Sequence, residues 1–150
     1  MHAYICLCLA TGIRTEEARA LRWQHIDFGD PEAEPPVPAS VAVWRSVRSH
    51  RTPRPRIAAH PGAPAMAVAA LRIHKERQAE ERQTAGARWN DHDLVFATRA
   101  GAALDAANVR RQLRAACKAA KIGPGCTPRE LRHSFVSLMS CGVPELGHQS

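Results

Sequence analysis

The sequence of 150 residues contains little tyrosine, little lysine and no long apolar stretch. Its only tyrosine is Tyr4, and its 21 basic residues include three lysines, the others being arginines. The most apolar run, YICLCLA at residues 4–10, is too short to span a membrane and lacks the basic start and cleavage site of a signal peptide. We therefore expect no membrane segment, and we expect this run to form a buried helix.

The five cysteines lack the spacings of a metal site. They stand at positions 6, 8, 117, 126 and 141, without a CxxC pair, and their odd number leaves at least one unpaired. We therefore expect reduced thiols, a cytoplasmic protein and no bound metal.

Positive charge is plentiful and unevenly distributed. The formal net charge is +7 and the pI is near 9.8, which suits a polyanionic partner. Residues 1–40 carry three basic and six acidic side chains, whereas residues 41–60 carry five basic and no acidic ones. Arginine suits bidentate phosphate binding, although a GC-rich coding sequence produces the same arginine and alanine bias.

Hydrophobic periodicity and capping residues predict one α+β domain, mainly α, with a small antiparallel sheet in its first half. The length suits a single core. A strand is expected over residues 40–47, where Val41 and Val43 alternate with Ala42 and Trp44, and a brief strand and turn are expected over residues 94–101. A short edge strand is expected at the end of the basic, proline-rich stretch that follows residue 47. Helices are expected over residues 2–10, 15–23, 65–82, 105–121 and 128–141.

The helix expected at 128–141 has an unusually basic start. Thr127 can cap it, Pro128 suits its first position, and Glu130 can complete a capping box. The free N–H groups of a first helical turn favour an anion, and Arg129 and Arg132 add positive charge there. The pattern predicts a phosphate ligand at this helix start.

The helix expected at 105–121 has a basic face beside an apolar stripe. Two interpretations stay open: a solvated cationic surface, or a contact with the DNA backbone. The side chains of this basic face are Arg110, Arg114, Lys118 and Lys121.

Three motifs resemble those of the tyrosine recombinase (phage integrase) family. ATGIRTEEARALRWQHIDF, at 10–28, resembles its first arginine box. TPRELRHSFVSLM, at 127–139, resembles its second arginine box, and LGHQS, at 146–150, resembles the short motif that follows. Residues 93–120 are similar to integrases of actinobacterial elements, so the resemblance covers nearly the whole chain.

The resemblance implies site-specific breakage and rejoining of double-stranded DNA through a 3′-phosphotyrosyl intermediate, without metal or cofactor. Arg14 and Arg132 would bind the non-bridging oxygens of the phosphate, where negative charge develops. His148 would donate a hydrogen bond to the same phosphate, and Glu17 would orient the site. Arg129 stands where many members have histidine, which favours phosphate binding over acid–base catalysis there.

The basic, proline-rich stretch departs from the family pattern. Relatives carry a general-acid lysine in this hairpin, whereas the RTP motif here places Arg51 at that position. An arginine holds its proton too tightly to deliver it readily to a leaving oxygen. We expect Arg51 and its neighbours Arg48 and Arg54 to contact DNA, together with Arg110, Arg114 and Lys118.

The resemblance also predicts that residues 1–150 are a partial catalytic domain. The family's nucleophilic tyrosine follows the LGH motif, and an N-terminal DNA-clamping domain precedes the first arginine box; this sequence shows neither. Tyr4, among apolar neighbours, is predicted to be a core residue. Full-length relatives form tetramers on DNA, but we expect no oligomer here. The chain is expected to bind DNA without forming the intermediate, the alternatives being a non-catalytic DNA-binding remnant and a non-functional pseudogene product.

Overall fold

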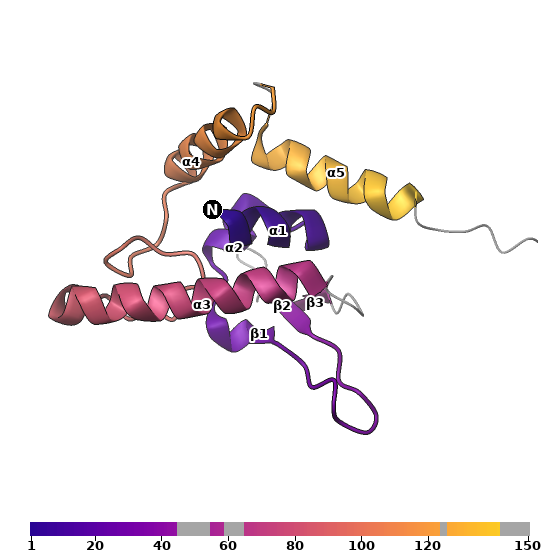
Figure 1. The fold of residues 1–150 in the computed structure, drawn as a ribbon, viewed down its shortest axis with the longest axis horizontal. Coiled ribbons are helices and arrows are strands. Elements are labelled where there is room, and N and C mark those ends of the chain that lie inside the picture. Colours follow the sequence, from indigo (N-terminus) through magenta and orange to yellow (C-terminus); the bar gives the residue numbers. More distant parts are fainter. Residues whose placement is uncertain (45–54, 59–64, 124–125, 142–150) are drawn as a thin grey trace, which may run out of the picture.

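The computed structural model describes residues 1–44, 55–58, 65–123 and 126–141 (Figure 1). It confirms a mainly helical domain with a small antiparallel sheet. Among the described residues, no helix is long and apolar enough to cross a membrane. The helices are α1 (His2–Thr11), α2 (Thr15–Arg19), α3 (Ala65–Ala85), α4 (Ala106–Ala119) and α5 (Pro128–Cys141); the strands are β1 (Ile26–Asp27), β2 (Ser40–Trp44) and β3 (Pro55–Ala58).

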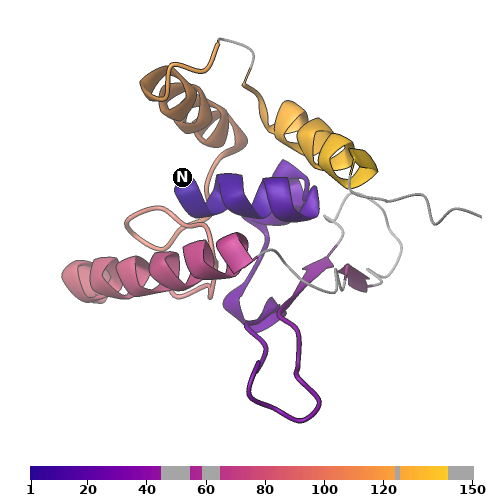
Figure 2. The same ribbon diagram turned by 45° about the vertical axis from the view of Figure 1, so that its right-hand side comes forward.

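Helix α1 is the centre of the helical packing, because α3 covers one side of it and α5 covers the other (Figures 1 and 2). A helix enclosed in this way must be apolar around its whole circumference. Leu7 and Cys8 are almost completely buried in α1, as the sequence predicts. The helix ends at Gly12, whose left-handed conformation (φ 62°) lets its N–H bond to the carbonyl of Cys8 at 2.9 Å.

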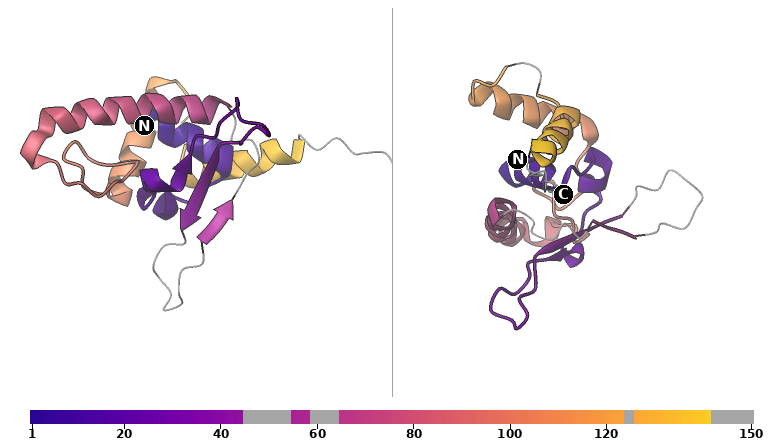
Figure 3. Two further views of the ribbon diagram at one scale, coloured as in Figure 1. Left: turned by 90° about the horizontal axis from the view of Figure 1, so that it is seen from below. Right: turned by 90° about the vertical axis from the view of Figure 1, so that its right-hand side faces the viewer.

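The sheet lies beside the helices and has the strand order β1-β2-β3, with both pairs antiparallel (Figure 3). Val41 and Val43 of β2 are buried, which confirms the alternation predicted for this strand. The expected edge strand is confirmed as β3. Strand β1 was not predicted, because two residues carry no detectable period.

Helix α2 ends four residues earlier than predicted. The backbone after it pairs with residues 93–95 instead: Trp23 donates to the carbonyl of Asp93 at 2.9 Å, and Val95 donates to Leu21 at 2.9 Å. These long-range bonds replace the helical bonds of the predicted last turn. Residues 23–25 then form a 3₁₀ turn.

The turn predicted within residues 94–101 is confirmed, since the N–H of Gly101 donates to the carbonyl of Thr98 at 2.9 Å, but the brief strand predicted before it is wrong. Two side chains of α3 bind its carbonyls where a neighbouring strand would. The buried Gln78 donates through Nε2 to Leu94 at 3.0 Å and to Val95 at 3.1 Å. His74 Nε2 also lies 2.6 Å from the Val95 carbonyl. Burial is the main cause that lowers the pKa of His74, so its neutral ring donates there. Only isolated bridges form in this segment, at residues 94 and 97.

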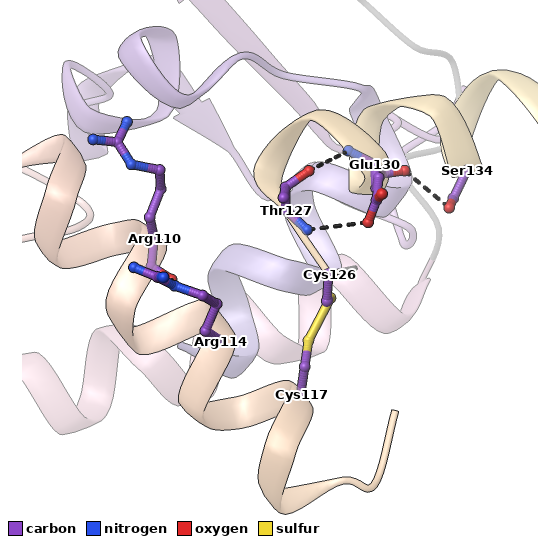
Figure 4. Close-up of a disulfide and its surroundings, with 7 residues drawn as sticks. All are labelled: Arg110, Arg114, Cys117, Cys126, Thr127, Glu130 and Ser134. Atoms are coloured by element: carbon purple, nitrogen blue, oxygen red, sulfur yellow. Dashed lines mark hydrogen bonds between the residues drawn. A yellow bond between two sulfur atoms is a disulfide. The ribbon is translucent and has the colours of Figure 1, made fainter. Parts of the chain in front are cut away.

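The expectation of reduced thiols is wrong for one pair. Cys117, in the last turn of α4, forms a disulfide with Cys126, and their Cα atoms lie 6.4 Å apart (Figure 4). The nine-residue separation lets the chain turn back after α4 and bring the two side chains together. Cys6 and Cys8 are free and buried, as expected for a buried helix.

Candidate nucleic-acid interface

The first predicted phosphate-binding arginine lies at the start of α2 and has a partner in the next turn. Arg14 is the N-cap residue, and its backbone N–H donates to Glu17 Oε2 at 2.9 Å. One guanidinium nitrogen also lies 3.4 Å from Glu17 Oε1. The Arg14 side chain is 46% exposed, whereas that of Glu17 is only 11% exposed. A largely buried carboxylate therefore restrains a half-exposed guanidinium that still faces solvent.

The second predicted arginine lies in the first turns of α5, and the predicted capping box is confirmed there. The N–H of Glu130 donates to Thr127 Oγ1 at 3.3 Å, and the N–H of Thr127 donates to Glu130 Oε2 at 3.2 Å (Figure 4). Arg129 and Arg132 are exposed. Within the described part of the chain, neither guanidinium has a hydrogen-bond or ion-pair partner, so both are free to bind an anion.

Arg14 and Arg132 each follow a residue that is buried in the same hydrophobic core. Ile13 comes immediately before Arg14, Leu131 comes immediately before Arg132, and both apolar side chains belong to one hydrophobic core cluster. The cluster forms because α5 packs across α1, and α1 leads directly into the start of α2 (Figure 2). Two positions that are 118 residues apart in sequence are thus fixed to the same core.

The basic face of α4 is exposed, as predicted. Val109, Leu113 and Cys117 are buried at intervals of four residues, which turns the remaining faces towards solvent. Arg110 and Arg114 lie one turn apart along the helix (Figure 4). Among the described residues, no acidic side chain forms an ion pair with any basic residue of α4. Its positive charge is therefore available to an external polyanion.

Tyr4 is confirmed as a core residue. Its side chain is 2% exposed, its ring meets that of Phe96 edge to face at 5.5 Å, and its hydroxyl lies 3.3 Å from Thr15 Oγ1. Burial raises its pKa well above the ordinary value for a phenol. A buried phenol that resists ionisation is poorly suited to attack a phosphodiester in solution.

Several predicted site residues lie outside the described residues. They are Arg48, Arg51 and Arg54 of the basic stretch, and His148. Their roles stay predictions. In the part of the chain that the structure describes, no group of three or more His, Cys, Asp or Glu side chains could hold a metal ion.

One contact between α2 and the start of the basic helix α4 was not predicted. Arg19 of α2 donates through Nε to the carbonyl of Leu104, directly before the α4 cap residue Asp105, and pairs with Glu16 at 2.7 Å. This contact ties the helix that begins at Arg14 to the start of the basic helix α4. No local pattern could have indicated it, because the partners are 85 residues apart.

Comparison with known proteins relates this chain to the integrases. The family model described as the phage integrase family matches residues 1–144. An integrase of Streptomyces ambofaciens is 51% identical over 149 residues, and the match covers 96% of this chain and 38% of that protein.

Solved structures with a similar fold include two recombinases. The crystal structure of XerA recombinase superposes with a TM-score of 0.65 at 25% sequence identity, covering 98% of this chain and 48% of XerA. XerH site-specific recombinase, bound to its difH substrate in a pre-cleavage complex, superposes with a TM-score of 0.60 at 19% identity, covering 93% of this chain and 34% of XerH. The chain thus spans less than half the length of each of these relatives.

Proposed function

Since the chain belongs to the phage integrase family, we propose that it binds a phosphate of double-stranded DNA at the position where integrases break and rejoin a strand. The observation that carries the proposal is the common support of Arg14 and Arg132. Each arginine follows a residue of one core cluster, and each stands at a capped helix start. We further propose that residues 1–150 form part of an integrase catalytic domain.

The proposed chemistry is charge neutralisation at a phosphodiester. When a nucleophile attacks phosphorus, extra negative charge develops on the non-bridging oxygens, and preorganised cationic donors stabilise it. A guanidinium presents several N–H donors in a planar fork that matches two oxygens at once. Arg14 and Arg132 would bind these oxygens from two sides, while Arg129 and the α4 face would hold the flanking backbone. His148 would donate to the same phosphate.

We propose that these 150 residues bind the phosphate without attacking it. The only tyrosine among them is Tyr4, whose hydroxyl is buried beside Thr15. Residues 1–150 would then act as a DNA-binding unit that forms no 3′-phosphotyrosyl intermediate, and we expect them to bind as a monomer.

Salt-dependent binding to a labelled duplex tests the proposal. Affinity should fall steeply with added salt, because each phosphate contact releases counterions. Arg110→Ala and Arg114→Ala should each weaken binding and reduce the salt slope by about 1. The matched control is Arg82→Ala, which removes an exposed arginine of α3 that is already paired with Asp91 at 2.6 Å. An equal loss in the control would contradict a specific role for the α4 face.

A suicide DNA substrate tests the absence of attack. We expect no DNA adduct that survives denaturation. An adduct that forms with the original chain and disappears in Arg132→Ala would show that the chain cleaves DNA. A broad, non-cooperative thermal melt without a shift on adding DNA would instead identify a chain that folds poorly and binds nothing.

A further inference from the structure

The junction between α4 and α5 contains a cysteine pair that phosphate binding does not use. Cys117 is only 6% exposed, whereas Cys126 is half-buried and immediately precedes Thr127, the first residue of the α5 capping box. The bond joins the last turn of α4 to the start of the helix that carries Arg129 and Arg132 (Figure 4). A covalent change at this pair is therefore a change at the base of the proposed phosphate-binding helix.

A cavity of about 420 Å³ lies beside the pair. Its lining includes both cysteines, and its charged side chains are Arg114, Lys118 and Lys121, with no acidic residue among the lining residues that the structure describes. Such a cavity favours an anionic ligand. Positive charge beside a cysteine also stabilises the thiolate, which is the species that carries out thiol–disulfide exchange.

We propose that Cys117 and Cys126 form a thiol–disulfide exchange site whose reactant is a small anionic disulfide such as glutathione disulfide. In the forward direction, the Cys126 thiolate attacks one sulfur of the small disulfide and releases one thiolate. The Cys117 thiolate then attacks the sulfur of Cys126, forms the protein disulfide and releases the second thiolate. The two cysteines lose two electrons and the small disulfide gains them; the small thiol reverses both steps.

The consequence for DNA rests on the proposed function. In the disulfide state, the bond between Cys117 and Cys126 holds the start of α5 to the end of α4. Restricting a segment in its binding conformation strengthens binding, because less conformational entropy is lost on association. The disulfide form should therefore bind duplex DNA several-fold more tightly than the dithiol form.

Mass spectrometry tests the exchange without DNA. The chain is reduced, freed of reductant and treated with glutathione disulfide, in a background that carries Cys141→Ser. It should lose the mass of two hydrogens, and one linked peptide should contain Cys117 and Cys126. Cys6 and Cys8 should stay unmodified, since both are buried and burial raises the pKa of Cys8 to about 12.

Two single variants test the order of attack. Cys117→Ala should accumulate one glutathione on Cys126, because the resolving thiol is absent. Cys126→Ala should accumulate little, because Cys117 is buried. Equal adducts on both variants, or an original chain that stays fully reduced under oxidant, would overturn the proposal.

A comparison of two oxidants tests whether the positive charge of the cavity favours an anionic reactant. Lys118→Gln should slow exchange with glutathione disulfide, which is anionic, and leave exchange with oxidised dithiothreitol, which is neutral, nearly unchanged. Equal slowing with both oxidants would overturn the proposed preference for an anionic reactant.

DNA affinity is then compared between the two redox states at one salt concentration. Tighter binding by the disulfide form, abolished in Cys126→Ala, supports control of DNA binding. Equal binding in both states would overturn that control. If neither state binds DNA, the proposed function fails, while the exchange chemistry is still decided by the mass measurements alone.

Discussion

The starts of α2 and α5 have the same kind of capping hydrogen bond, but the arginines beside them differ in their side-chain contacts. In both, a glutamate accepts a hydrogen bond from the backbone N–H of the residue three positions earlier: Glu17 from Arg14, and Glu130 from Thr127. At α2 the same glutamate also contacts the arginine side chain at 3.4 Å. At α5, Arg129 and Arg132 take no part in the capping bonds, and their side chains have no partner among the described residues.

The comparison separates a restrained arginine, Arg14, from a free one, Arg132; we call them the restrained arm and the free arm of the proposed phosphate site. An arginine that is already ordered loses less side-chain entropy when it binds, so Arg14 should contribute more affinity than Arg132. The free arm can adapt its position to the DNA, but it must be ordered at the moment of contact.

Arg14→Ala should have the largest effect on DNA binding. It removes the restrained guanidinium and leaves the Glu17 carboxylate beside the proposed phosphate site without a counter-charge. We expect a loss of about 3 kcal/mol, or roughly 150-fold in affinity. Fluorescence anisotropy with a labelled duplex measures it, with Arg82→Ala as the control.

Arg132→Ala should weaken binding by less, about 2 kcal/mol or roughly 30-fold, because the free side chain loses more entropy on binding. The melting temperature should be unchanged, since the side chain is exposed. The same anisotropy titration and a thermal melt measure both quantities. A larger loss for Arg132→Ala than for Arg14→Ala would reverse the assignment of restrained and free arms.

Thr127→Ala leaves the net charge unchanged and should lower the stability of the fold. It removes the hydroxyl that accepts from the N–H of Glu130, and such N-cap losses lower the free energy of unfolding by about 1 kcal/mol. Urea denaturation followed by circular dichroism measures it. Arg14→Ala, at the N-cap of α2, should lower stability by less, because an arginine side chain has no acceptor to lose. Equal losses would mean that the two caps do not differ as described.

The smallest effects should have opposite signs. Glu17→Gln keeps an oxygen for the cap but removes the charge that restrains Arg14, so binding should weaken by about twofold. Glu130→Gln, the matched change at α5, restrains no arginine and removes a negative charge beside Arg129 and Arg132, so binding should strengthen by about twofold. Strengthening in both variants would show that Glu17 acts through its charge alone and does not position Arg14.

Local signals in the sequence predicted much of the fold. The capping box at Thr127 and Glu130 involves residues within three positions of each other, and it was confirmed. The alternation of Val41 and Val43 and the burial of Tyr4 were confirmed for the same reason. Each depends on nearest neighbours along the chain.

The errors arose where a contact depends on how the chain folds back on itself rather than on its nearest neighbours in sequence. Gln78 and His74 bind the carbonyls of residues 94 and 95, so a segment with strand-like composition forms no strand. The link from Arg19 to Leu104 spans 85 residues. The pairing of Cys117 with Cys126 depends on how the chain turns after α4, which cysteine counting cannot show.

The residue types of the candidate site could be predicted from the sequence, but the contacts that hold these residues in place could not. The two arginine motifs identified Arg14 and Arg132, and the structure adds that Ile13 and Leu131 fix both positions to one core. Among the described residues, Glu17 contacts an arginine side chain and Glu130 contacts none. Spacing could not indicate this difference, because both glutamates stand at the third residue of their helices.

A double-mutant cycle tests most directly whether Arg14 and Arg132 bind one phosphate. Duplex affinity is measured for Arg14→Ala, Arg132→Ala and the double variant at one salt concentration. Two arms on one phosphate should be coupled, so the double variant should lose about 1 kcal/mol less than the sum of the single losses. Losses that add within about 0.3 kcal/mol would show that the two arginines act on DNA independently.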